Sequence, residues 1–127
     1  MGQYYRIVNI DKKEFLHPHK FGDGLKIWEF GFADYGTMAG LTFLLASGHG
    51  SGINETESSE LIGSWAGDRI VILGDYSEEF PEVSEEMYSD EKEDTYKDIS
   101  NQIIEVLKQD EDFNEHFLSK NTFGLRH

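Results

Sequence analysis

The apolar run Ile70-Val71-Ile72-Leu73 constrains the fold more than any other segment of the chain. Its residues are mostly β-branched, and a run this short favours a strand over a helix. A strand with one exposed face would alternate apolar and polar residues, so an unbroken run predicts a strand at the centre of a sheet. We therefore expect the core to be organised around a β-sheet.

The N-terminal region predicts further strands for this sheet. Residues 4–10 are β-branched and aromatic, residues 11–13 suit a tight turn, and residues 14–17 predict a second strand. These segments together indicate a hairpin. Residues 25–30 alternate for most of their length and predict a third strand, with a short helix as the alternative.

Two helical regions are expected to cover the sheet. Thr37 can cap a buried helix over residues 38–47, whose apolar residues fall at helical spacing. The second helix should begin near Asp98 or Ser100 and break at 110–111, where two acids interrupt its apolar stripe. A further helical turn would follow and present Phe113 and Phe117, which are four residues apart.

The order of these elements predicts an α+β fold. Strands and helices follow one another without the regular alternation of a doubly wound sheet. At 127 residues the chain can bury one core but has little room for two domains. We expect a single domain over residues 1–127, with a small antiparallel or mixed sheet packed against a buried helix and a C-terminal helix.

The composition excludes several classes of protein. The chain has no cysteine, so a disulfide, a thiolate nucleophile or a thiolate metal site is impossible. Its formal net charge of −14 argues against direct binding of nucleic acid or of an anionic membrane. The N-terminus lacks the apolar region of a secretory signal, and the longest apolar stretch, residues 41–46, is too short to span a membrane. We expect a cytoplasmic protein without a cofactor.

The acidic residues are concentrated in one part of the chain. Residues 75–115 hold sixteen of the 25 acids and three of the 11 bases. Within this region, residues 77–97 are expected to form an irregular surface segment. Nine closely spaced carboxylates in this segment are the candidate binding residues: Glu78, Glu79, Glu82, Glu85, Glu86, Asp90, Glu91, Glu93 and Asp94.

A row of carboxylates can imitate the charge of a nucleic acid and occupy a groove lined by lysine and arginine. The leading hypothesis is therefore a non-enzymatic acidic protein that binds a basic partner protein, with a nucleic-acid-binding enzyme as the concrete case. Inhibitors of the phage counter-defence or immunity type act in this way. Interleaved Phe80, Met87, Tyr88 and Tyr96 would serve as apolar anchors of the interface. The plainer interpretation of the acidic segment is a solvated surface loop. The sequence does not indicate an oligomeric state.

An alternative is a metal site at the end of the predicted hairpin. His17 and His19 would point to one face of an extended segment, as two ligands of a metal ion require. Asp23 could supply a third ligand. The proline between the two histidines suits the end of a strand equally well, which favours a structural role.

A second alternative is a hydrolytic enzyme built from His49, Asp68 and Asp75. The two aspartates flank the apolar strand, and acids at strand ends can converge on a cleft. Both also adjoin a glycine, where aspartate commonly forms a turn. A third possibility is a protein that sequesters a small molecule.

Three stretches resemble a group of small acidic bacterial proteins of unknown function: MGQYY at residues 1–5, the region 12–26 with HPHKFGDGLK, and GSWAGDRIVI at residues 63–72. The similarity spans most of residues 1–76. This resemblance implies a natural, self-contained fold and assigns no activity to any residue. It draws attention to one candidate shared site, formed by Asp23, Trp65, Asp68 and Arg69.

Overall fold

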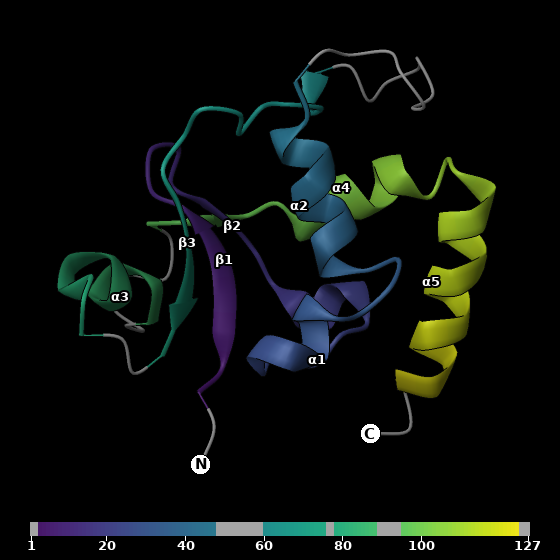
Figure 1. The fold of residues 1–127 in the computed structure, drawn as a ribbon, viewed down its shortest axis with the longest axis horizontal. Coiled ribbons are helices and arrows are strands. Elements are labelled where there is room, and N and C mark those ends of the chain that lie inside the picture. The colour runs from purple at the N-terminus through teal and green to yellow at the C-terminus, as the bar shows by residue number, and fades with distance from the viewer. Residues whose placement is uncertain (1–2, 48–59, 76–77, 89–94, 125–127) are drawn as a thin grey trace.

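The computed structural model describes residues 3–47, 60–75, 78–88 and 95–124, with side chains up to Lys120. Strands, helices and one short 3-10 helix, η1, follow one another without regular alternation (Figure 1). In chain order they are β1 (Tyr5–Asn9), β2 (Glu14–Leu16), η1 (Pro18–Phe21), α1 (Ile27–Gly31), α2 (Thr37–Leu45), β3 (Ile70–Gly74), α3 (Pro81–Tyr88), β4 (Lys97–Asp98), α4 (Ser100–Leu107) and α5 (Glu111–Gly124).

The sheet is mixed and has the strand order β3-β1-β2-β4. Strand β1 runs antiparallel to both β2 and β3, and the short β4 runs parallel to β2. Ile7 faces Leu16 in β2 and Ile72 in β3, which fixes the register on both sides of β1. The predicted hairpin is confirmed, and so is the α+β fold with a small mixed sheet.

The position predicted for β3 is wrong. Among the described residues β3 is an edge strand, and β1 lies between two neighbours. The continuous apolar run of β3 has a different cause, because helices cover both faces of the sheet. Val71 and Leu73 pack on the face that carries α3, while Ile70 packs on the opposite face. Coverage of both faces accounts for the apolar residues at 70, 71 and 73 even at an edge, whereas Ile72 belongs to neither cluster and is 39% exposed.

Side chains of the two central strands alternate between two apolar clusters. Ile7 and Leu16 enter the larger cluster, which α2, α4 and other segments complete. Val8 and Phe15 enter a smaller cluster on the other face, under α3. Figure 1 accordingly shows α3 on one side of the sheet and α1, α2, α4 and α5 on the other. The molecule therefore has three layers, with the sheet in the middle.

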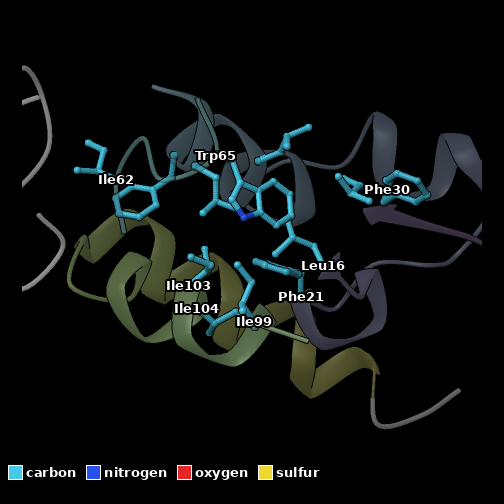
Figure 2. Packing of buried hydrophobic residues seen from close by; sticks show 12 residues of the cluster. Leu16, Phe21, Phe30, Ile62, Trp65, Ile99, Ile103 and Ile104 are labelled. Carbon is cyan, nitrogen blue, oxygen red and sulfur yellow. The ribbon is translucent and has the colours of Figure 1, made fainter. Parts of the chain in front are cut away.

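Trp65 is the largest fully buried side chain of the larger cluster. Figure 2 shows its ring facing Leu16, Phe21 and the isoleucines of α4. Its indole Nε1 donates a hydrogen bond of 2.8 Å to Oε1 of Glu14 in β2. Its backbone N–H donates to the Leu44 carbonyl near the end of α2. Trp65 thus joins the buried helix to the sheet. The buried helix is confirmed as Thr37–Leu45, but the role predicted for Thr37 is wrong: Gly36 is the N-cap, and Thr37 is the first helical residue, with its hydroxyl donating to Asp23.

Two segments differ from the leading expectations. Residues 81–88, which were expected to be irregular, form α3, and residues 97–98 form β4. In α3, Val83 and Met87 lie four residues apart and pack against the sheet, so the amphipathic spacing outweighs the high charge. The predicted third strand over 25–30 is wrong, and its stated alternative is confirmed, because Ile27–Gly31 forms α1.

The predicted break between the last two helices is confirmed. Helix α4 ends at Leu107, and Asp110 begins the next helix by accepting a 3.1 Å hydrogen bond from the Phe113 N–H. Helix α5 is longer than the single turn expected, since it extends to Gly124. Phe113 is buried and Phe117 packs at the edge of the larger cluster. These two rings bring α5 against the body of the molecule.

Candidate functional site

The described part of the acidic segment contains four exposed glutamates. Glu78 and Glu79 precede α3, Glu82 and Glu85 lie on it, and all four are exposed. Glu86 is half-buried and pairs with Lys13 of the β1–β2 turn, at 3.2 Å between Oε2 and Nζ. We call these five residues the acidic face. The remaining candidates, Asp90, Glu91, Glu93 and Asp94, lie outside the described residues.

The inner side of α3 is firmly attached to the sheet. Met87 is buried against Val8, Phe15 and Leu73, and Tyr88 Oη donates a 2.9 Å hydrogen bond to the Leu73 carbonyl. Burial raises the pKa of Tyr88 to about 12, so the phenol stays protonated and keeps this bond. Three residues of the acidic face, Glu82, Glu85 and Glu86, therefore lie on a helix that is attached to the sheet, and Glu78 and Glu79 lie in the segment just before it.

An arginine reinforces the same attachment. The Arg6 guanidinium lies 5.2 Å from the centre of the Phe15 ring and 5.0 Å from that of the Tyr88 ring. Both distances fall within the range of cation–π attraction. Arg6 therefore bridges the sheet and the last residue of α3.

The expected apolar anchors of an interface are mostly core residues. Met87 and Tyr96 are buried, and Tyr88 is half-buried against the sheet. The interpretation of these three as surface anchors is therefore wrong, because they are the residues that fix α3 and β4 to the sheet. Phe80 is 39% exposed and remains available next to the acidic face.

The two histidines of the metal alternative lie together in a structural arrangement. His17 caps η1, and its Nδ1 accepts a 3.3 Å hydrogen bond from the His19 N–H. The rings stack with centroids 5.6 Å apart. Burial, with the nearby Arg6 charge as a second cause, lowers the pKa of His17 to about 4. The His17 ring is thus held neutral near pH 7.

Asp23, the third residue of the metal alternative, has hydrogen-bond partners on both carboxylate oxygens. Its Oδ2 accepts hydrogen bonds of 2.8 Å from both N and Oγ1 of Thr37, at the start of α2. Its Oδ1 accepts from Nζ of Lys120 in α5 at 2.5 Å. Within the described ranges, no group of three or more histidine, cysteine or acidic side chains could hold a metal ion.

The two aspartates of the hydrolytic alternative lie at opposite ends of β3. Asp68 accepts hydrogen bonds from Asn9 Nδ2 at 2.9 Å and from Lys12 Nζ at 2.6 Å, and these bonds lower its pKa. Asp75 Oδ1 accepts from the Tyr4 N–H at 3.2 Å. Seven residues of extended chain separate the aspartates by roughly 20 Å, and His49 lies outside the described residues. The structure does not bring these two carboxylates together.

The residues of the suggested shared site serve three separate parts of the fold. Asp23 joins α5 to the start of α2, Trp65 lies in the core, and Asp68 fixes the turn between β1 and β2. Arg69 supports the same turn, since its backbone N and its Nε donate to Asp11 at 2.8 and 2.9 Å. These bonds lower the pKa of Asp11, with the backbone bond as the largest cause. Their contacts indicate structural roles.

An exposed aromatic pair lies away from the acidic face, and the sequence patterns considered above did not predict it. Trp28 and Phe32 are 64% and 75% exposed, and their rings stack with centroids 4.5 Å apart. Nearby in sequence, Tyr35 stacks on His116 of α5 with centroids 4.0 Å apart. The spacing of four residues between Trp28 and Phe32 was the available signal, because it places both rings on one side of a helical turn.

Comparisons of the chain with protein-family models, curated proteins and solved structures give no match. In the parts of the chain that the structure describes, no helix combines the length and the apolar character needed to cross a bilayer. A functional proposal for this chain therefore depends on the chemistry of its own surface.

Proposed function

We propose that this chain is a non-enzymatic binding protein that uses the acidic face to engage a basic partner protein. The observation that supports the proposal is that the two sides of α3 differ: one side packs on the sheet and the other carries exposed carboxylates. Its apolar side is held to the sheet by Met87 and by the Tyr88 hydrogen bond, while Glu82 and Glu85 are exposed. A rigid support lowers the entropy cost of binding, because the interacting groups are already in place.

The arrangement of the carboxylates favours a cationic ligand. Glu82 and Glu86 are four residues apart, or about 6 Å along the helix axis, and Glu85 lies between them in the chain. Like charges at this spacing destabilise a helix in isolation. Lys13 already pairs with Glu86, so the exposed Glu82 and Glu85 are the residues of α3 that would act together on an approaching cation, within the Debye length of about 8 Å at physiological ionic strength.

The concrete form of the partner is a protein with a lysine- and arginine-lined groove, such as a nuclease or another nucleic-acid-binding enzyme. In that case the chain would act as an inhibitor, since its carboxylates would occupy the positions of phosphate groups. Exposed Phe80 beside the carboxylates would add apolar contact at the border of the interface.

The test compares two variants with the same change in net charge. The face variant replaces Glu78, Glu79, Glu82 and Glu85 by glutamine, and the control variant replaces four exposed glutamates elsewhere: Glu60, Glu105, Glu111 and Glu115. Binding is measured by fluorescence anisotropy with a labelled octa-arginine peptide, and inhibition by DNA cleavage assays with a panel of nucleases. Circular dichroism establishes that both variants are folded.

We expect the face variant to lose about fourfold to several-hundredfold in affinity for the peptide, because four surface ion pairs at 0.2–1 kcal/mol each amount to roughly 0.8–4 kcal/mol. The control variant should lose much less, and wild-type affinity should fall steeply as salt is raised. Equal losses in the two variants would show that net charge, rather than the acidic face, determines binding. The inhibitor form fails if no nuclease is inhibited in a way that the face variant abolishes.

A further inference from the structure

The outer edge of β3 is an unpaired strand edge. Within the described parts of the chain, no strand lies beside β3 on the side away from β1. The other edge strand of the sheet, β4, is only two residues long, whereas β3 has five residues. Long strand edges are the places where sheets recruit a further strand.

The register identifies the backbone groups that this edge offers. Ile10 N donates to the Arg69 carbonyl, and Asp75 N donates to the Tyr4 carbonyl, so Arg69 and Asp75 face β1. Backbone direction alternates along a strand, so Val71 and Leu73 also bond to β1. The N–H and C=O groups of the intervening residues, Ile70, Ile72 and Gly74, therefore point outward, and no described residue is hydrogen-bonded to them.

The side chains of β3 lack the features that protect exposed strand edges. Such edges in monomers usually carry lysine, proline or an inward-pointing charge. Strand β3 reads Ile-Val-Ile-Leu-Gly and contains none of these residues. Ile72, at its centre, is 39% exposed. An apolar strand with free backbone groups and an exposed central isoleucine is suited to pairing.

We propose that β3 pairs antiparallel with β3 of a second copy of this chain, about a two-fold axis at Ile72. Ile72 would then face Ile72 of the second copy, and Ile70 would face its Gly74. All three outward-pointing residues become hydrogen-bonded pairs in this register, which adds about six backbone hydrogen bonds. The result is one continuous sheet across both copies, and it does not depend on the function proposed for the acidic face.

Charge complementarity selects the second copy as the occupant. The residues that flank β3 are Arg69 at its start and Asp75 at its end. Antiparallel pairing centred on Ile72 places Arg69 opposite Asp75 of the second copy, at both ends of the interface. Such positions are non-hydrogen-bonded pairs, in which opposing side chains approach most closely. Within each copy Arg69 also pairs with Asp11, and Asp75 also accepts from the Tyr4 N–H, so the contact across the axis would add a second partner to each of the two side chains. The strand is complementary to itself in charge as well as in backbone pattern.

The net charge predicts how salt affects this association. Two copies that each carry a formal charge of −14 repel each other, and salt screens that repulsion. Dimerisation should therefore strengthen as salt is raised from low to physiological concentration. Binding of a cationic partner to the acidic face should weaken over the same range, so the two associations respond to salt in opposite directions.

Sedimentation equilibrium over a range of protein concentrations tests the proposal. Wild-type protein should approach twice the monomer mass of 14.6 kDa as its concentration is raised. Ile72→Lys, which places two like charges in direct opposition, should raise the dimer dissociation constant about tenfold or more. Ile72→Pro should do the same, because it removes an N–H that points away from β1 and so leaves the β1–β3 bonds intact. The matched control is Phe32→Lys, at an exposed aromatic residue of the surface beside α1.

Amide hydrogen exchange followed by NMR provides a second measurement that needs no variant. The amides of Val71 and Leu73 bond to β1 and should be protected at every protein concentration. The amides of Ile70, Ile72 and Gly74 should become protected only as the concentration rises. The proposal is overturned if the wild type stays at monomer mass, if Phe32→Lys rather than Ile72→Lys abolishes the dimer, or if the outward amides exchange at a rate independent of concentration.

Discussion

Replacement of Lys120 by methionine tests how much the ion pair with Asp23 contributes to docking of α5. Lys120 Nζ lies 2.5 Å from Asp23 Oδ1 and donates a second hydrogen bond of 2.9 Å to the Asp34 carbonyl. The Asp23 side chain is 1% exposed and that of Lys120 is 24% exposed. Methionine keeps most of the volume and removes the ammonium, so a carboxylate is left buried without its cation.

The geometry sets the size of the expected effect. Removal of one partner from a buried ion pair costs about 3–5 kcal/mol. The two Thr37 donors remain bonded to Asp23, and water can reach the Lys120 side of the pair. We therefore expect a loss of about 2–3 kcal/mol in the free energy of unfolding, which at an m-value of about 2 kcal/mol per molar lowers the urea midpoint by roughly 1 M.

The assay is urea unfolding followed by tryptophan fluorescence, together with amide exchange in α5. Lys108→Met is the control for loss of a more exposed lysine contact: Lys108 pairs at 3.6 Å with a largely exposed Glu105 and lies 5.8 Å from the centre of the Phe117 ring of α5, and its loss should cost only about 1 kcal/mol. A double variant, Lys120→Met with Asp23→Asn, should be more stable than Lys120→Met alone, since no charge is left buried. The reasoning is refuted if Lys120→Met changes neither the midpoint nor the exchange of α5, or if the double variant is the less stable of the two.

Two further predictions concern the interior. Burial is the main cause that lowers the pKa of His17 from 6.5 to about 4, so the folded state disfavours the charged imidazole. This residue should therefore reduce the free energy of unfolding as the pH falls from 6.5 towards 4, by about 1–2 kcal/mol after allowance for its partial exposure. His17→Asn, which can keep the cap of η1, should remove this pH dependence in urea unfolding at pH 7 and pH 4.5. If the stability difference between the two proteins is the same at both pH values, the assignment is wrong. Gly63→Ala should lower the free energy of unfolding by about 2–4 kcal/mol in the same assay, because Gly63 has φ of +72° and a Cβ there would overlap the Ala46 carbonyl oxygen. Gly67→Ala should lower it by only about 1 kcal/mol, because Gly67 has φ of +86° but open space around it. Equal losses in the two variants would refute the steric argument.

The local part of the fold could be predicted from the sequence because its signals lie close together in the chain. The β1–β2 hairpin, the buried α2 and the break before α5 each depend on spacings of a few residues. Residues 27–31 support either a strand or a helix by pattern alone, and the capping interaction of Glu29 Oε1 with the Lys26 N–H belongs to the helical form.

The errors have a common physical origin in contacts between distant residues. The place of β3 in the sheet depends on which strands become its neighbours, and an apolar run reports only that both faces are covered. The amphipathic spacing of α3 was present at Val83 and Met87, although its carboxylates obscured it. No local pattern reveals that Lys120 bonds to Asp23, because 97 residues separate the two.

The candidate site could be predicted only in part. The carboxylates of the acidic face were identified by composition, and four of them are exposed in the structure. The fixed orientation of α3 could not be foreseen, because it depends on Tyr88 reaching the Leu73 carbonyl and on Arg6 lying between two rings. The aspartates of the alternative sites were identified as residues able to bind a metal ion or to act in hydrolysis. Their lysine, asparagine and threonine partners come from other parts of the fold, so the sequence did not reveal these contacts.

The connectivity of β1 has a consequence for the order in which the molecule assembles. Asn9 pairs with Glu14, but on its other side it pairs with Ile70, which is 61 residues further along the chain. A nascent polypeptide can therefore form the hairpin early and must wait for most of its length to be synthesised before the second side of β1 is covered. Closing so long a loop carries an entropy cost before any contact compensates for it. Folding should consequently be slow for a protein of this size, with the hairpin as its earliest ordered part.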